Sequence, residues 1–124
     1  MKIETFEDVE SWKKARELVK SIYLLTNKNP FLKDFGIKDQ IQRAAVSVMS
    51  NIAEGFDSGT NKSFINFLNY SYRSASEVQS LLYVANDLEY ISNQQFTQLH
   101  RLLFDIKNLI GGFIKYLKKQ RTKH

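Results

Sequence analysis

The fold is decided by residues 96–117, FTQLHRLLFDIKNLIGGFIKYL. The apolar side chains of this stretch recur at spacings of three and four without a miss: Phe96, Leu99, Leu103, Ile106, Ile110, Phe113 and Leu117. This alternation is typical of the seam along which a helix packs in a left-handed bundle. The preceding SNQQ, residues 92–95, matches a capping box and predicts where the helix begins. The pair Gly111-Gly112 costs about 1 kcal/mol per residue relative to Ala, and we expect a neighbouring backbone to come close there.

Three earlier segments also carry apolar residues at helical spacing. We expect helices from about Thr5 to the NKNP stretch at 27–30, from Ile37 to Glu54, and from about Asn61 to Leu88. Gly55 is then the expected C′ residue that ends the second helix. No segment shows the sustained alternation of a strand. The sequence therefore predicts an all-α, antiparallel, up-and-down four-helix bundle.

The expected helices differ in how much apolar surface they carry. The stripe of the first helix is Val9, Trp12, Ala15, Val19, Ile22 and Tyr23. The stripe of the third helix is Phe64, Leu68, Ser71, Ala75, Val78, Leu82 and Ala85. Two further sets lie beside it: Phe67, Tyr70, Leu81 and Leu88, and then Ile65, Tyr72, Tyr83 and Tyr90. One face of a bundle helix does not need so much apolar surface, so this helix is either the most buried or partly in contact with another subunit.

The composition limits the class of protein. The chain has 124 residues, one proline and no cysteine, which predicts one domain over residues 1–124, no membrane span, no disulfide and a cytoplasmic location. The net charge is +5, and residues 115–124, KYLKKQRTKH, carry it, because residues 1–114 are balanced. This basic C-terminal tail suits nucleic acid, an anionic membrane or an acidic partner, or it merely complements the dipole of a helix end.

Residues suited to catalysis or metal binding are scarce. His100 and His124 have no partner at the spacing of a metal site, and we expect His100 to lie on the surface. Arg101 is not followed by a histidine at the four- to six-residue interval of some helical-bundle ribonucleases, and Arg121 is too close to His124. A phosphate loop and a nucleophile motif are both missing. We therefore expect no enzymatic activity, no metal and no cofactor.

Two groups of basic side chains are candidates for contact with nucleic acid. They are Lys13, Lys14, Arg16 and Lys20 in the first helix, and Lys115, Lys118, Lys119, Arg121 and Lys123 in the tail. Glu10 and Glu17 dilute the first group. Tyr116 either stacks on a base or packs against the bundle. The tail lacks dispersed groove-reading Arg and Asn, so we expect contact with phosphate, low sequence specificity and steep salt dependence.

A polar band runs beside the apolar stripe of the second helix. Its members are Arg43, Ser47, Ser50, Asn51 and Glu54. Small Ser and Asn side chains permit close approach of helices, whereas a solvated band usually consists of long Lys and Glu. The band is either an ordinary exposed face or a packed seam. Our hypothesis is that Arg43, Ser47, Asn51 and Glu54 form a buried or half-buried network that fixes helix register or a subunit contact.

The stretches VESWKKARELVKSIY, QIQRAAVSVMSNIAEGF and FINFLNYSYRSASEVQSLLYVANDL resemble a bacterial family. Its members are four-helix-bundle proteins first noticed as reading frames in intervening sequences of large-subunit ribosomal RNA genes. The resemblance covers about residues 6–117 and is most specific at residues 40–55. The chain departs from the family pattern at Lys33, in residues 57–59 and at Arg73.

The resemblance implies a cytoplasmic bundle that assembles as a ring, usually a homopentamer, without enzymatic activity or a cofactor. A related branch comprises accessory proteins of diversity-generating retroelements, which bind nucleic acid through basic surfaces and partner a reverse transcriptase. Our first functional hypothesis is therefore an oligomeric accessory protein that binds RNA or DNA with low sequence specificity. The alternative is a structural or adaptor protein that binds another protein through the surplus aromatic stripe of Ile65, Tyr72 and Tyr83.

Overall fold

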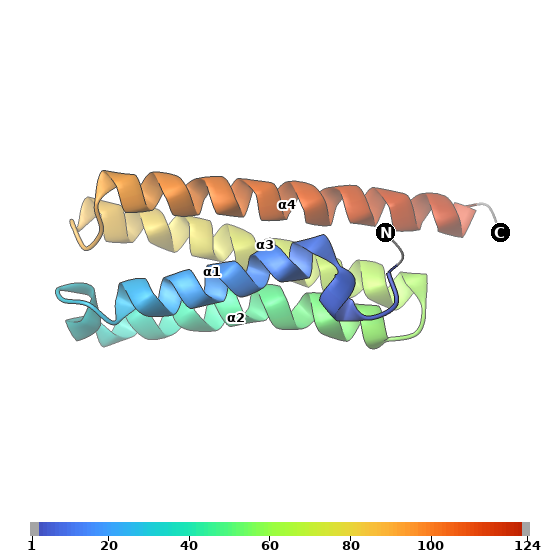
Figure 1. Cartoon of the computed structure of the whole chain (residues 1–124), viewed down its shortest axis with the longest axis horizontal. Helices are drawn as coiled ribbons and strands as arrows, with labels where there is room; N and C mark the ends of the chain where they lie inside the picture. The colour runs from blue at the N-terminus through green and yellow to red at the C-terminus, as the bar shows by residue number, and fades with distance from the viewer. Residues whose placement is uncertain (1–2, 123–124) are drawn as a thin grey trace.

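The computed structural model describes the backbone of residues 3–122 and the side chains of residues 3–120. Its four long helices are α1, Glu10–Thr26; α2, Phe35–Asp57; α3, Asn61–Asp87; and α4, Asn93–Thr122. Two short 3₁₀ turns, η1 at Phe6–Asp8 and η2 at Phe31–Lys33, precede α1 and α2. Successive helices run antiparallel and side by side, so that α1 begins at the end of the molecule where α4 finishes (Figure 1). The predicted four-helix bundle is confirmed.

The core follows the predicted apolar stripes closely on two helices. All seven residues of the α3 stripe are buried. On α4 the seam is buried except for Phe96 and Phe113, which are half-buried and pack against the core. On α1 the prediction was wrong at Tyr23, which is exposed, while Leu18 and Leu25 fill the core instead. Tyr23 follows the fully buried Ile22 by one residue, and one residue turns an α-helix by about 100° away from the core.

Side-chain hydrogen bonds cap the starts of α2, α3 and α4. The Thr60 hydroxyl accepts a hydrogen bond from the Ser63 N–H (3.1 Å) at the start of α3. Ser92 and Gln95 form the predicted capping box before α4, at 3.1 and 2.8 Å. Asp34, which the sequence did not indicate, caps α2 through the Ile37 N–H at 3.4 Å.

Asp34 and Asp8 each accept hydrogen bonds that shift a pKa, that of Tyr90 in the first case and that of Asp8 itself in the second. The Tyr90 hydroxyl donates to Asp34 at 2.8 Å, and this hydrogen bond raises the pKa of Tyr90. The Asp8 carboxylate accepts the backbone N–H groups of Glu4 (3.0 Å) and Thr5 (3.1 Å), which lower its pKa. Thr5 and Asp8 form a capping box, but it closes η1, and α1, which was expected from about Thr5, begins only at Glu10.

Gly55 lies inside α2, not after it. A Cβ at this position would sit 2.7 Å from the Cβ of Phe67 and 2.8 Å from Cδ1 of Phe64, both on α3. The missing side chain therefore lets the α3 phenylalanines pack onto the α2 backbone. The prediction of a C′ glycine was wrong because the helical hydrogen bonds continue through Gly55 to Asp57.

The glycine pair in α4 has the opposite surroundings. A Cβ at Gly111 or Gly112 would meet no described atom within 4 Å. The expected close approach of a neighbouring backbone is therefore absent within residues 3–122, because the pair lies on the outer side of α4. Among the helices that the structure describes, none has the length and apolarity needed to cross a membrane.

Candidate nucleic-acid interface

The cations of α1 do not form a free basic stripe. Lys13 is paired with Glu10, with Nζ 3.3 Å from Oε1. The guanidinium of Arg16 lies 6.0 Å from the centre of the Trp12 ring. Exposed Glu17 separates Arg16 from exposed Lys20 along the helix. The half-buried Lys14 points to another side, since it is one residue from Lys13.

The predicted basic tail forms the last turns of α4. Lys115, Lys118 and Lys119 are all exposed, and so is Tyr116. The backbone of Arg121 belongs to the last turn of α4, but its side chain and Lys123 lie outside the described residues. The end of α4, drawn in red, reaches beyond the turn between α2 and α3 (Figure 1).

A longer surface along α4, which we call the outer stripe, was not anticipated from the sequence. It consists of residues spaced three and four apart on the side opposite the core seam: Thr97, Arg101, Phe104, Asn108, Gly111, Lys115 and Lys118. All of them are exposed except the half-buried Gly111. The signal was present in the sequence, because the outer stripe has the same alternation of three and four as the core seam, and its residues follow those of the seam by one or two positions.

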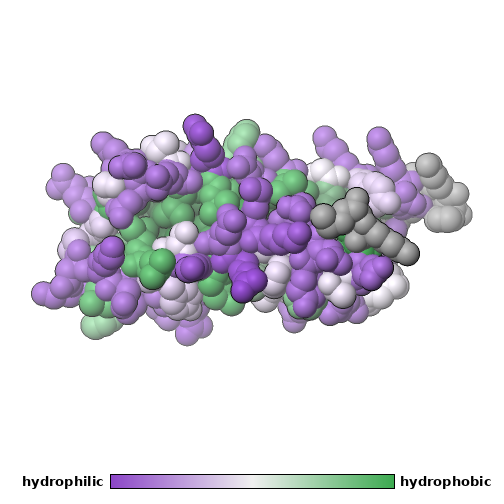
Figure 2. Space-filling view, in the orientation of Figure 1, coloured by the Kyte–Doolittle hydropathy of each residue, from purple (hydrophilic) through white to green (hydrophobic). Residues whose placement is uncertain are grey.

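The charged residues of the outer stripe are all positive. The outer stripe itself contains three cations, Arg101, Lys115 and Lys118, and no acidic residue. Helix α4 as a whole contains six Lys or Arg residues and one acidic residue, Asp105. The upper edge of the molecule, which α4 forms, carries mainly hydrophilic side chains (Figure 2). Cations held by a helix at regular spacing give a phosphate chain several contacts at once, and binding of this kind depends steeply on salt.

The side chains between α3 and α4 are connected across the seam. Lys107 donates to Oε1 of Gln79 (3.2 Å), and Nε2 of Gln79 lies 2.9 Å from Nε2 of His100. Lys107 also sits 4.8 Å from the centre of the Tyr72 ring, and the ring of Tyr83 is 6.0 Å from that of His100. His100 is thus half-buried in a contact between two helices, and the prediction of a simple surface histidine missed its partners.

The polar band of α2 divides into two parts. Ser47 and Asn51 belong to a packed seam: their side chains are 2.9 Å apart, and the Ser47 hydroxyl lies 2.8 Å from that of Ser74 on α3. Arg43 instead pairs with Asp39 at 2.9 Å, and its side chain is 80% exposed. Glu54 is also exposed.

A buried network that joins Arg43 to Glu54 is therefore wrong for the single chain. The two residues share a side of the helical wheel, but eleven residues separate them by roughly 16 Å along the helix axis. A subunit contact by these two residues is a separate matter and stays a prediction. Nearer the start of α2, the side-chain amide of Gln40 donates a hydrogen bond to Glu77 on α3 at 3.2 Å.

The surplus apolar residues of α3 are sorted differently from the prediction. Ile65 is buried. The rings of Tyr72 and Tyr83 contact Lys107 and Phe96 of α4. Tyr72 and Tyr83 nevertheless remain 38% and 50% exposed. A second exposed group lies on the α2 side of α3 and its C-cap and comprises Tyr70, Val84 and Leu88, exposed by 52%, 42% and 52%. We call these three residues the α3 flank.

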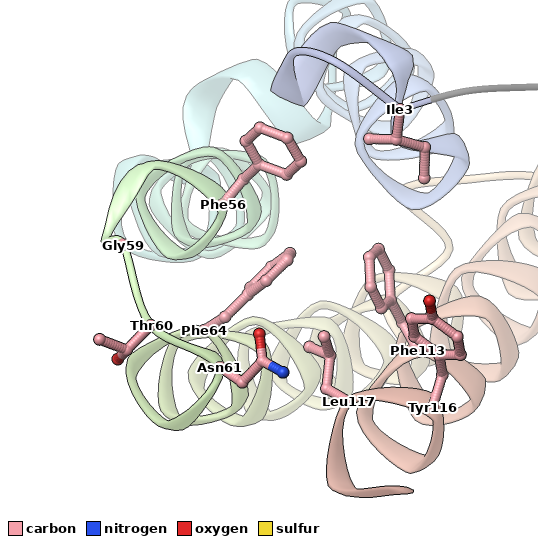
Figure 3. Close-up of a pocket in the computed structure, with 9 residues that line it drawn as sticks. All are labelled: Ile3, Phe56, Gly59, Thr60, Asn61, Phe64, Phe113, Tyr116 and Leu117. Carbon is pink, nitrogen blue, oxygen red and sulfur yellow. The ribbon is translucent and has the colours of Figure 1, made fainter. Parts of the chain in front are cut away.

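A pocket of about 510 Å³ opens at the end of the bundle where α4 finishes. Phe64, Phe113 and Asn61 point toward a space bordered by Phe56 and Ile3 (Figure 3). The lining contains no carboxylate, histidine or lysine. It therefore lacks the ionisable pairs of acid–base catalysis. No three His, Cys, Asp or Glu residues between 3 and 122 lie close enough together to hold a metal ion.

Comparisons with known proteins agree with this architecture. The sequence profile of a family described as 23S rRNA-intervening sequence protein matches residues 7–112. The chain is also similar to a crystal structure from Bacteroides thetaiotaomicron, a protein of unknown function from the S23 ribosomal protein family. The TM-score is 0.77 at 27% sequence identity, over 85% of this chain and 95% of that one. No protein with a curated description matches the sequence.

Proposed function

Because this chain belongs to the family of 23S rRNA-intervening sequence proteins, we propose that it is a non-enzymatic, oligomeric accessory protein that binds nucleic acid with low sequence specificity. The observation that carries the proposal is the outer stripe of α4. Its cations are exposed, and the helix that bears them holds six basic residues against one acidic residue. Such a surface matches the phosphate backbone and contains little that could read base edges.

An oligomer of the chain would raise its affinity for nucleic acid. Each copy of the chain adds another outer stripe, and linked weak sites bind with an avidity that no single site has. We propose a cytoplasmic homopentamer, the assembly that the family resemblance implies. Its partners would be RNA or DNA, with a reverse transcriptase as a protein partner in a retroelement setting.

The test is fluorescence anisotropy of labelled single-stranded RNA and duplex DNA, titrated with purified protein from low to physiological salt. The variant is Lys115→Gln/Lys118→Gln, because truncation after residue 114 would also remove buried Leu117. The matched control is Lys20→Gln/Lys28→Gln, which neutralises two exposed lysines on and just after α1.

We expect the α4 variant to bind more weakly and to lower the slope of log K against log salt by about one for each phosphate that the protein no longer neutralises. The α1 control should retain the wild-type slope. Equal effects of the two variants would place the binding surface elsewhere, and no binding by wild type at low salt would refute the proposal.

The α3 flank supports an adaptor function as the second candidate. Exposed apolar residues on one side of a helix are typical of surfaces that bind another protein. If nucleic acid does not bind, retention of a protein partner by wild type and its loss in Tyr70→Ser would favour the adaptor. The α4 variant should then retain the partner.

A further inference from the structure

An aromatic pocket interrupts the outer stripe at its end farthest from the tail. Its volume is about 300 Å³, and its lining comprises Phe96, Thr97, His100, Arg101 and Phe104. Phe104 is 59% exposed although the other outer-stripe residues are polar or glycine. Phe104 lies beside two further aromatic rings in this lining, Phe96 and His100, and aromatic faces at a surface can stack on a planar ligand.

We propose that this pocket binds an unpaired nucleobase by stacking, so that the protein prefers single-stranded nucleic acid. The inference rests on the proposed function and deepens it. Base stacking needs an accessible π-face and tolerates any base. Phe104 offers such a face one helical turn beyond His100, and residues four apart lie on the same side of a helix.

The aromatic groups behind Phe104 are held in place. The Phe96 ring lies 4.9 Å from that of Tyr83 and 5.5 Å from that of His100. His100 is fixed in turn by Gln79, whose amide oxygen is occupied by Lys107. Phe96 and His100 are half-buried, so a base can enter without first ordering the pocket.

The charges around the pocket suit a nucleic-acid strand. Arg101 lines the pocket, and its guanidinium can bind a phosphate or stack on a base. Asn108, Lys115 and Lys118 continue along the same side of α4. A strand whose phosphates follow these residues would carry a base to Phe104. A duplex would not, because its bases are stacked and paired inside. The surroundings also include an exposed carboxylate, Asp87, which lies one helical turn beyond Tyr83 at the end of α3.

The experiment compares three ligands of the same chemistry at the backbone: a short oligothymidine, an abasic sugar-phosphate chain of equal length, and the corresponding duplex. The variant is Phe104→Leu, and the matched control is Phe35→Leu, a second exposed phenylalanine at the start of α2. Dissociation constants are measured by anisotropy at several salt concentrations, from low to physiological, and on folded protein verified by circular dichroism.

We expect wild type to bind oligothymidine at least about fivefold more tightly than the abasic chain. Phe104→Leu should lose that difference while it binds the abasic chain as wild type does, and Phe35→Leu should behave as wild type. Equal affinity of wild type for the abasic chain and oligothymidine, with normal salt dependence, would overturn the stacking site alone. Failure to bind any of the three ligands would overturn the proposed function together with it.

Discussion

Gly55 sets how closely α2 and α3 approach. The Cβ of Phe67 and the ring of Phe64 occupy the space where a Gly55 side chain would begin. Two packed helices usually keep 8–10 Å between their axes, and a residue without a Cβ allows the short end of that range. The sequence pattern predicted Gly55 to end α2, because a glycine needed for close packing inside a helix and a glycine at C′ cannot be told apart in the sequence.

The first prediction concerns Gly55→Ala. The new methyl group would overlap atoms less than 3.0 Å away, so we expect a loss of about 1–3 kcal/mol in the free energy of unfolding. Gly112→Ala is the matched control. Its Cβ would meet nothing within 4 Å, and it should gain up to about 1 kcal/mol from helix propensity.

Both variants are measured by urea unfolding followed by circular dichroism. An unchanged midpoint for Gly55→Ala would mean that α3 moves aside without cost. A destabilised Gly112→Ala would mean that another copy of the chain covers α4 at that point.

Pairs of helices are joined by a few buried or half-buried polar contacts between otherwise apolar faces. Ser71 on α3 donates to the carbonyl of Val48 on α2 at 2.7 Å, and Ser47 meets Ser74 nearby. α1 and α2 are joined by Gln42, whose amide donates to the hydroxyl of Thr26 at 2.9 Å. These contacts fix the axial level of one helix against the next, which apolar stripes alone leave loosely defined.

The second prediction tests the link between α1 and α2. Thr26 is fully buried, and its hydroxyl also donates to the carbonyl of Ile22 at 2.8 Å. Thr26→Val keeps the shape but leaves the Gln42 amide without its acceptor, so we expect a loss of about 1 kcal/mol. The double variant Thr26→Val/Gln42→Leu should recover part of it, because both partners are then apolar. A double-mutant cycle by urea unfolding measures the coupling, and strictly additive effects would contradict the link.

The whole molecule has two unlike surfaces. Along α4 lies the basic outer stripe, and between α2 and α3 lies a surface that combines the exposed Arg43 and Glu54 with the α3 flank. We propose that the second surface carries the contact between subunits in the nucleic-acid-binding protein. Under the adaptor function, the same surface would instead bind the protein partner, so the two roles are alternatives. This surface offers exposed apolar side chains beside charges of both signs, a composition that suits a subunit interface.

The third prediction is that Val84→Glu lowers the molar mass of the assembly. A carboxylate buried at a subunit contact without a partner is costly. Leu24→Glu is the control, because Leu24 is also an exposed aliphatic residue inside a helix, at 60% against 42% for Val84, but it lies on α1. Size-exclusion chromatography with light scattering gives the mass. Dissociation by the control alone, or by neither variant, would remove the α3 flank from the interface.

The sequence alone predicts the four helices, the capping box before α4 and nearly all of the core on α3 and α4. It does so because the helical period fixes which side of a helix each residue occupies, and because burial of apolar side chains selects that side. The concentration of positive charge in α4 was likewise readable from composition. The outer stripe was readable too, although only its last part, the basic tail, was predicted.

The packing of the four helices determines which neighbour each side of a helix contacts and at what height along the axis. The packing of Gly55 against Phe64, the links of His100 to Gln79 and Lys107, and the separation of Arg43 from Glu54 all depend on it. The physical reason is that a period gives an angle around one axis, whereas a contact also needs the axial height and the neighbouring helix. Those two quantities are set by how the four helices pack together.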